Sequence, residues 1–139
     1  CSAFKITWGK INMAKFDDVY YDLWENTEFV AITTKGEDGP HVVGNWGDYV
    51  RKLGLRDETI VMPAGSYHQT EKNLSQDNRV TLLIASRQVH GSRTPGQGCE
   101  ITGTGEVVTS GAIVDEVKEN FPWARGALVV QVEKVTTQL

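Results

Sequence analysis

The fold class is decided by the stretch Phe29-Val30-Ala31-Ile32-Thr33-Thr34-Lys35-Gly36-Glu37-Asp38-Gly39-Pro40-His41-Val42-Val43-Gly44-Asn45-Trp46. Its first six positions are dominated by β-branched residues, which are typical of a strand. The segment Glu37-Asp38-Gly39-Pro40 is rich in the residues that turns prefer, so positions 41–46 are predicted to return as the partner strand of a hairpin. The hairpin indicates a protein built mainly from antiparallel β-structure.

Four further segments of similar composition are predicted as strands. They are Thr59–Pro63, Arg79–Ser86, Cys99–Thr109 and Ala127–Val135. Short helices are expected near His68–Gln76 and Gly111–Phe121, and a single glycine-rich loop over Gly91–Gly98. Because an open sheet edge favours aggregation, about six strands with so few helices predict a closed or nearly closed antiparallel barrel.

Ahead of the hairpin the hydrophobic period changes to that of a helix, which is predicted to begin at Met13. Phe16, Val19, Tyr20 and Leu23 form its apolar stripe, and Asp17 and Asp18 suit the positive end of its dipole. Residues 1–12 are interpreted as an N-terminal extension, the alternative being a short structured arm. Residues 13–139 are then one domain, which agrees with a chain of 139 residues.

Composition excludes several classes of protein. Fourteen Lys and Arg residues against eighteen Asp and Glu give a net charge of −4, which argues against a broad nucleic-acid surface. No apolar run approaches the ~20 residues that a membrane helix needs. Two cysteines, Cys1 and Cys99, are too few for a disulfide framework, so we expect a cytoplasmic protein.

The chain offers no pattern of metal ligands or of a catalytic nucleophile. His41, His68 and His90 lie far apart, and neither cysteine is near a histidine in the sequence. Cys99 opens a predicted strand, where the role of a small buried hydrophobic residue is favoured. No metal site is therefore predicted, and no catalytic residue is identified.

One segment has the features of a phosphate-binding site. A predicted strand runs through Gly65 into the start of a helix, where Ser66 and Gln69 fit a capping box with Ser66 as N-cap. Glycine before a helix lets backbone N–H groups approach a phosphate, which the helix dipole also favours. Thr70 and Lys72 add a hydroxyl and a cation. The alternative is that Ser66 caps the helix and nothing binds.

Two tryptophans are candidates for a wall beside a planar ligand. Trp46 ends a predicted strand next to Asn45, so an aromatic surface and an amide lie together. Trp123 lies at a predicted helix–strand junction, where it suits a core anchor equally well. Spacing alone does not place the two tryptophans in one site.

At this point an ordered set of motifs resembles a known family. In chain order the motifs are Val30-Ala31-Ile32-Thr33-Thr34-Lys35-Gly36-Glu37-Asp38-Gly39-Pro40-His41, Asn45-Trp46 with Tyr49, the segment from Pro63 to Asn73, Ala85-Ser86-Arg87, Pro95-Gly96-Gln97-Gly98, Trp123-Ala124-Arg125 and Ala127-Leu128-Val129. Each motif alone is weak, but together they make residues 16–139 resemble the FMN-binding split barrels related to pyridoxamine 5′-phosphate oxidase.

The resemblance implies a mainly β fold: a six-stranded antiparallel split β-barrel of Greek-key topology with short helices. It also implies a homodimer with one FMN per subunit at the interface. The implied phosphate residues are Gly65, Ser66, Gln69 and Thr70. The implied flavin-ring residues are Asn45 and Trp46, with Pro63 and Ala64 nearby, and Trp123 and Leu139 from the second subunit.

The sequence departs from the family pattern at two places. Gln69 stands where the pattern has a lysine that contacts the phosphate, so weaker phosphate binding is expected unless Lys72, His68 or Arg87 compensates. Gly44 and Asn45 also differ from the residues of a relative, which has Asn and Thr there.

The functional hypothesis is an FMN-binding flavoprotein in electron transfer or simple flavin-dependent reduction, with an unidentified redox partner. Two alternatives stay open. One is an oxidoreductase that reduces a small organic substrate with NAD(P)H. The other is a haem-binding or flavin-binding protein without turnover. Since flavin supplies the chemistry in the first two cases, the protein contributes geometry and electrostatics.

Overall fold

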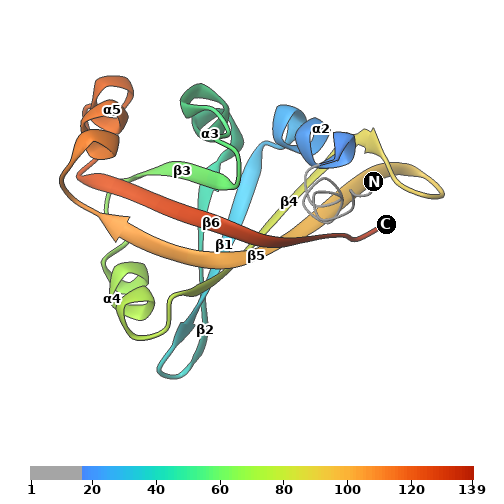
Figure 1. The fold of residues 1–139 in the computed structure, drawn as a ribbon. Helices are drawn as coiled ribbons and strands as arrows, with labels where there is room; N and C mark the ends of the chain where they lie inside the picture. The colour runs from blue at the N-terminus through green and yellow to red at the C-terminus, as the bar shows by residue number, and fades with distance from the viewer. Residues whose placement is uncertain (1–16) are drawn as a thin grey trace, which may run out of the picture.

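The computed structural model describes residues 17–139. Its strands are β1 (Phe29–Gly36), β2 (Gly39–Trp46), β3 (Thr59–Ala64), β4 (Arg79–His90), β5 (Pro95–Val108) and β6 (Gly126–Thr137). Its helices are α2 (Asp18–Asn26), α3 (Gly47–Leu53), α4 (His68–Gln76) and α5 (Ala112–Asn120). Figure 1 shows α5, α3 and α2 in a row along one side of the sheet, with α4 on the opposite side.

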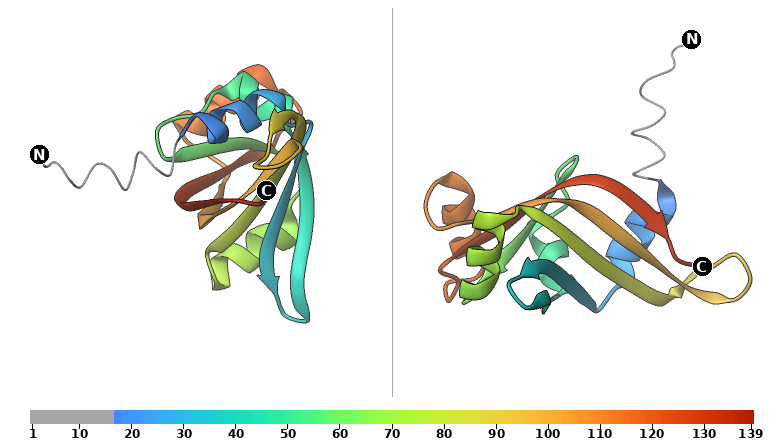
Figure 2. Two further views of the ribbon diagram at one scale, coloured as in Figure 1. Left: turned by 90° about the vertical axis from the view of Figure 1, so that its right-hand side faces the viewer. Right: turned by 90° about the horizontal axis from the view of Figure 1, so that it is seen from below.

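The strands form one six-stranded sheet in the order β2-β1-β4-β5-β6-β3, in which every neighbouring pair is antiparallel. The sheet curls into a half-barrel, which the end-on view in Figure 2 makes clear. Its two edge strands approach each other where the Asn45 side chain of β2 bonds the Pro63 carbonyl of β3. The predicted six-stranded antiparallel barrel with short helices is therefore confirmed.

The hairpin that decided the fold class has a continuous register from Phe29 opposite Trp46 to Gly36 opposite Gly39. Gly39 closes the tight turn with a φ of 125°, a conformation that side chains other than glycine's rarely adopt. Because every β1 residue has a partner on β2, the register fixes which side chains share each face of the sheet.

Two hydrophobic clusters hold the fold together. The first fills the half-barrel and includes Trp24, Ile32, Met62, Leu82 and Leu128. The second lies between the outer side of β3 and β6 and the helices α3 and α5, and it includes Leu53, Val61, Val117 and Phe121. The two strands that they share are thus covered on both faces, which explains why β3 is apolar along almost its whole length.

The structure agrees with the predicted elements most closely where local signals are strong. α4 has the predicted bounds, and Cys99 is fully buried, as expected for a small hydrophobic residue. Burial also raises the pKa of the Cys99 thiol to about 12. α2 begins at Asp18, and Asp17 caps it by accepting a hydrogen bond from the Tyr20 backbone at 3.1 Å.

Other expectations need correction or lie out of reach. The segment Gly96-Gln97-Gly98, predicted as loop, belongs to β5, because its backbone pairs with β4. α3 was not predicted, since it has only seven residues and begins with Gly47. The extension predicted at residues 1–12 lies outside the described residues. The helix predicted from Met13 begins at Asp18 instead, because Asp17 has an extended backbone and serves as its N-cap. No helix between residues 17 and 139 is long and apolar enough to cross a membrane.

Candidate functional site

The C-terminal ends of β2 and β3 are joined by one buried amide. Asn45 Nδ2 donates to the Pro63 carbonyl at 3.1 Å, and Asn45 Oδ1 accepts from the Trp46 backbone N–H at 2.8 Å. Pro63 and Ala64 are buried, whereas the next two residues, Gly65 and Ser66, are exposed. Asn45 therefore positions the strand ends, and solvent reaches this segment first at Gly65.

An aromatic pair stands at the same end of the hairpin. The Phe29 and Trp46 rings meet edge to face with centroids 5.8 Å apart, and both side chains are about half exposed. Phe29 lies directly on Gly44: a Cβ added there would come within 2.0 Å of the ring. Since large exposed aromatic side chains are uncommon at a free surface, the pair marks a place where a planar ligand or a partner is expected.

Trp123 covers the loop that follows β3. A Cβ added at Gly65 would lie 3.2 Å from the Trp123 ring, so the ring packs on the glycine backbone. Trp123 also packs against Tyr49 and Phe121, with ring centroids 5.9 and 5.7 Å apart. One chain thus brings Trp123 to Gly65 unaided, although the resemblance assigned the Trp123 contribution to the second subunit.

The predicted capping box at Ser66 and Gln69 is wrong. The N-cap of α4 is Tyr67, and no side chain caps the helix. Gln69 instead donates to Asn73 Oδ1 at 2.8 Å, one turn further along. The Ser66 side chain is displaced from the capping position because the chain makes a left-handed turn at Tyr67, with φ of 59°.

Tyr67 ties the loop to the hairpin. Its hydroxyl donates to the Gly44 carbonyl at 2.6 Å, and burial raises its pKa to about 12. A left-handed conformation in a residue other than glycine costs roughly 1–3 kcal/mol, so the surrounding contacts must hold it in place. The loop between β3 and α4 and the end of β2 are therefore one connected unit.

Thr70 carries an unsatisfied polar atom in this unit. Its side chain is fully buried, and Oγ1 has no hydrogen-bond partner among residues 17–139. A buried hydroxyl without a partner costs about 1–3 kcal/mol, and such atoms are rare in folded proteins. The atom fits a group that accepts or donates a hydrogen bond near the first turn of α4.

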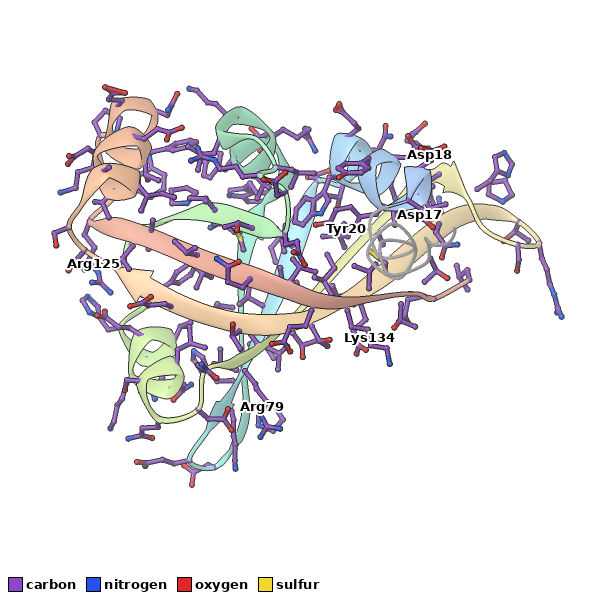
Figure 3. The ribbon with its side chains drawn as sticks, viewed as in Figure 1. Asp17, Asp18, Tyr20, Arg79, Arg125 and Lys134 are labelled. Atoms are coloured by element: carbon purple, nitrogen blue, oxygen red, sulfur yellow. The ribbon has the colours of Figure 1, made fainter. Side chains whose placement is uncertain are left out.

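Arg125, which sequence analysis did not single out as functional, holds the same loop from the β6 side. Its backbone N–H donates to the Ala64 carbonyl at 2.9 Å, and its Nε donates to the Ser66 carbonyl at 2.9 Å. Its Nη2 forms an ion pair with Glu71 Oε1 at 2.7 Å. Figure 3 shows Arg125 where β6 begins, at the end of the sheet near α4.

The sequence held little signal for this role, because the partners of Arg125 lie 54 and 59 positions upstream. The cations considered from the sequence are placed differently. Lys72 is exposed and faces Glu37 at 4.0 Å, and Arg87 lines a pocket beside the C-terminus on β4. His68 is exposed in the first turn of α4.

Leu139 lies away from the other predicted site residues. Gln97 of β5 holds it by accepting from its backbone N–H at 2.8 Å and donating to its carbonyl at 2.6 Å. The Leu139 side chain is 62% exposed. In Figure 1 the C-terminus is at the opposite end of the sheet from α5 and α4. The structure thus gathers the other predicted site residues around the β3–α4 loop and leaves Leu139 apart.

Comparisons with known proteins show the family of this chain. The sequence profile of the family described as pyridoxamine 5′-phosphate oxidase matches residues 16–139. An FMN-binding protein of Nitratidesulfovibrio vulgaris strain Miyazaki F is 40% identical over 113 residues, covering 81% of this chain and 90% of the relative.

Two solved structures share the fold. A HupZ variant from Group A Streptococcus superposes with a TM-score of 0.71 at 19% identity, covering 88% of this chain and 98% of that one. An FMN-binding protein of Syntrophomonas wolfei superposes with a TM-score of 0.61 at 11% identity, covering 94% of this chain and 88% of that one. At these identities the two structures show the fold alone. The match of the family profile over nearly the whole chain and the 40% identical relative show that this chain belongs to the pyridoxamine 5′-phosphate oxidase family.

Proposed function

We propose that this chain binds FMN and works in electron transfer or simple flavin-dependent reduction. The supporting structural observation is the buried, unpartnered Thr70 hydroxyl in the first turn of α4, beside the exposed backbone of Gly65 and Ser66. The 40% identical relative is an FMN-binding protein, and its similarity spans 81% of this chain. Bound FMN supplies one- or two-electron redox chemistry, which the side chains of this site do not offer by themselves.

The residues present fit the two ends of FMN. The phosphate is assigned to Gly65, Ser66, Gln69 and Thr70, where backbone N–H groups, hydroxyls and a helix N-terminus suit an anion. The isoalloxazine ring is assigned to the neighbourhood of Asn45, Trp46, Pro63 and Ala64. Because Asn45 already uses its side chain within the protein, its part is to hold the strand ends, and Trp46 supplies the aromatic surface.

We further propose a homodimer with FMN at the interface, to which Leu139 of the second subunit contributes. The outer face of the hairpin and of β4 carries Phe29, Val42, Trp46 and Leu83, all 45% exposed or more. The strand register places them on one side of the sheet, since Phe29 faces Trp46 and Ala31 faces Leu83. A pocket of about 740 Å³ continues this face between β1, β4 and β5. A second copy would cover the apolar area.

The test of FMN binding is an absorbance spectrum of the purified protein, followed by titration of flavin-free protein with FMN. Flavin absorbance that is released as FMN on denaturation is expected. Colourless protein that shows no change in FMN absorbance or fluorescence during titration would contradict the proposal.

Reduction kinetics separate the two redox hypotheses. In a stopped-flow experiment, NAD(P)H is expected to leave the flavin absorbance unchanged over minutes, whereas dithionite removes it. Rapid loss of flavin absorbance with NAD(P)H would instead favour the oxidoreductase that acts on a small organic substrate.

A further inference from the structure

We propose that Arg125 supplies the positive charge for the phosphate of FMN. This inference rests on the proposed function. It concerns which residue of this chain balances the charge of the ligand.

Arg125 lies against the segment to which the phosphate is assigned. The Arg125 backbone N–H bonds the carbonyl of Ala64, and its side chain bonds the carbonyl of Ser66. It is therefore hydrogen-bonded to the residues on both sides of exposed Gly65. This short segment leads directly into the first turn of α4, where Thr70 carries its unpartnered hydroxyl. The guanidinium group is therefore fixed against the backbone whose N–H groups are assigned to the phosphate.

The Arg125 guanidinium has hydrogen-bond donors that the described part of the protein does not use. A guanidinium has five N–H donors. Nε and Nη2 of Arg125 bond Ser66 and Glu71, whereas Nη1 has no hydrogen bond to any residue from 17 to 139. About a quarter of the side chain is exposed, so an anion in the loop has access to it. Charge-assisted bonds from arginine to phosphate are among the strong hydrogen bonds of proteins.

The other charged and polar side chains that the structure describes near the loop do not supply a positive charge for the phosphate. Gln69 is neutral and bonds Asn73, so it adds no charge to the site. Lys72 faces Glu37, and its side chain is more than half exposed, so solvent screens its effect. Glu71 is an acid in the first turn of α4, next to the assigned phosphate, and Arg125 neutralises it. Without Arg125 this end of the loop would present a carboxylate to a dianionic ligand.

The test compares FMN with riboflavin, which has the same ring and lacks the phosphate. For Arg125→Gln, we expect FMN affinity to fall by about ten- to hundredfold, the range for a hydrogen bond to a charged group. Riboflavin affinity is expected to stay within about twofold of the wild type, because the lost interaction is with the phosphate. Arg125→Lys is expected to recover part of the FMN affinity, since it keeps the charge.

Glu71→Gln tests the same idea in the opposite direction. It removes the carboxylate that competes with phosphate for Arg125, so FMN is expected to bind several-fold more tightly and riboflavin equally well. FMN affinity of the wild type is also expected to fall with ionic strength more steeply than that of Arg125→Gln.

The matched control is Arg56→Gln. Arg56 likewise bonds a backbone carbonyl, that of Leu53, and pairs with a glutamate, Glu116, but it lies just before the opposite end of β3. Arg56→Gln is expected to change neither the affinity for FMN nor that for riboflavin.

Equal loss of FMN and riboflavin binding in Arg125→Gln would overturn the proposal, because Arg125 would then only position the loop. If Arg125→Gln does not fold, unchanged FMN affinity in Glu71→Gln overturns it. Wild-type protein that binds neither flavin contradicts the proposed function and this inference with it.

Discussion

At Gly44 the main chain of β2 is enclosed on two sides. The Phe29 ring lies on its Cα, and the Tyr67 hydroxyl donates to its carbonyl. The half-exposed Phe29 ring occupies the space that a side chain at position 44 would fill. The absence of a side chain at Gly44 therefore makes room for the Phe29 ring, beside the place assigned to the flavin ring.

Gly44→Ala is expected to lower the free energy of unfolding by about 1–3 kcal/mol, because the new methyl group displaces Phe29. Chemical denaturation measures this loss. In Gly44→Ala/Phe29→Val the ring is absent, so the two substitutions are expected to cost less together than the sum of their separate effects. If the losses in unfolding free energy of the two single variants simply add in the double variant, the Phe29 ring can move away from position 44 at no energetic cost.

Thr70→Val replaces an unpartnered buried hydroxyl with a methyl group of similar shape. The flavin-free protein is expected to become more stable, or to change by less than about 0.5 kcal/mol, because no hydrogen bond is lost. FMN affinity is expected to fall, by about five- to tenfold for one hydrogen bond. Paired urea unfolding and FMN titration measure the two effects.

Thr34→Val is the matched comparison for Thr70→Val. Thr34 is equally buried, but its hydroxyl accepts a hydrogen bond from Asn73 Nδ2 at 3.1 Å. This substitution is expected to destabilise the protein by about 1–3 kcal/mol, since it leaves the amide unpaired. A comparable loss in flavin-free Thr70→Val would mean that the Thr70 hydroxyl already has a partner.

At the scale of elements, the start of α4 is fixed by neighbours rather than by a cap of its own. Tyr67 contacts β2 through its hydroxyl, and Arg125, the residue just before β6, bonds the carbonyl of Ser66. The helix thereby gains a defined position against two strands that are remote in sequence. Its first turn stays free of a side-chain cap, which leaves N–H groups for an anion.

The Tyr67 phenol makes the stability of this junction depend on pH. Its folded-state pKa is raised to about 12 by burial, against about 10 when unfolded. The raised pKa of Tyr67 adds fully to the free energy of unfolding below pH ~10. This contribution is lost as the pH rises towards 12, because the unfolded state then releases a proton that the folded state keeps. Between these values the loss is about 1.4 kcal/mol per pH unit.

Tyr67→Phe is expected to destabilise the protein by about 1 kcal/mol at pH 7, through loss of the bond to Gly44. The decline of its stability above pH ~10 is expected to be shallower than in the wild type, because one titrating group is gone. Urea unfolding at pH 7 to 11 measures both. Burial also raises the pKa values of Tyr20 and Cys99, so some decline is expected to remain. Identical slopes would exclude Tyr67 as a contributor.

At the scale of the molecule, helices cover one part of the outer face of the sheet and leave another part bare. α3 and α5 cover the outer side of β3 and β6, whereas no helix between residues 17 and 139 packs on the outer side of the β1–β2 hairpin and β4 near Leu83. This asymmetry leaves four large apolar side chains exposed on neighbouring strands. It supports the proposed homodimer, in which Leu139 of one chain reaches the site of the other.

Leu83→Glu is expected to give a monomer, because it places a charge in the centre of the proposed interface. Tyr21→Glu on α2 is the matched control, since Tyr21 is 42% exposed against 45% for Leu83. The control is expected to keep twice the protomer mass in light scattering after size exclusion. A wild-type protein with the mass of one protomer would contradict the homodimer.

The sequence by itself determined the strands, α4 and the family, because these follow from local composition and from ordered motifs. The hairpin 29–46 is the best example: β-branched residues and turn residues determine its pairing within 18 consecutive positions. Local signals were misleading at Ser66. They predicted a capping box there, but the N-cap of α4 is Tyr67, which has a left-handed backbone conformation.

Only the tertiary structure decided how the site is assembled. It placed Trp123 on Gly65, the Phe29 ring on Gly44, and Arg125 against the carbonyls before α4. These contacts join residues that lie from 15 to about 60 positions apart, and they depend on the curl that brings β2, β3 and β6 to one end of the sheet. Local sequence records which groups are present, but distances between remote groups are fixed by packing, so the cation opposite Glu71 became visible only in the folded chain.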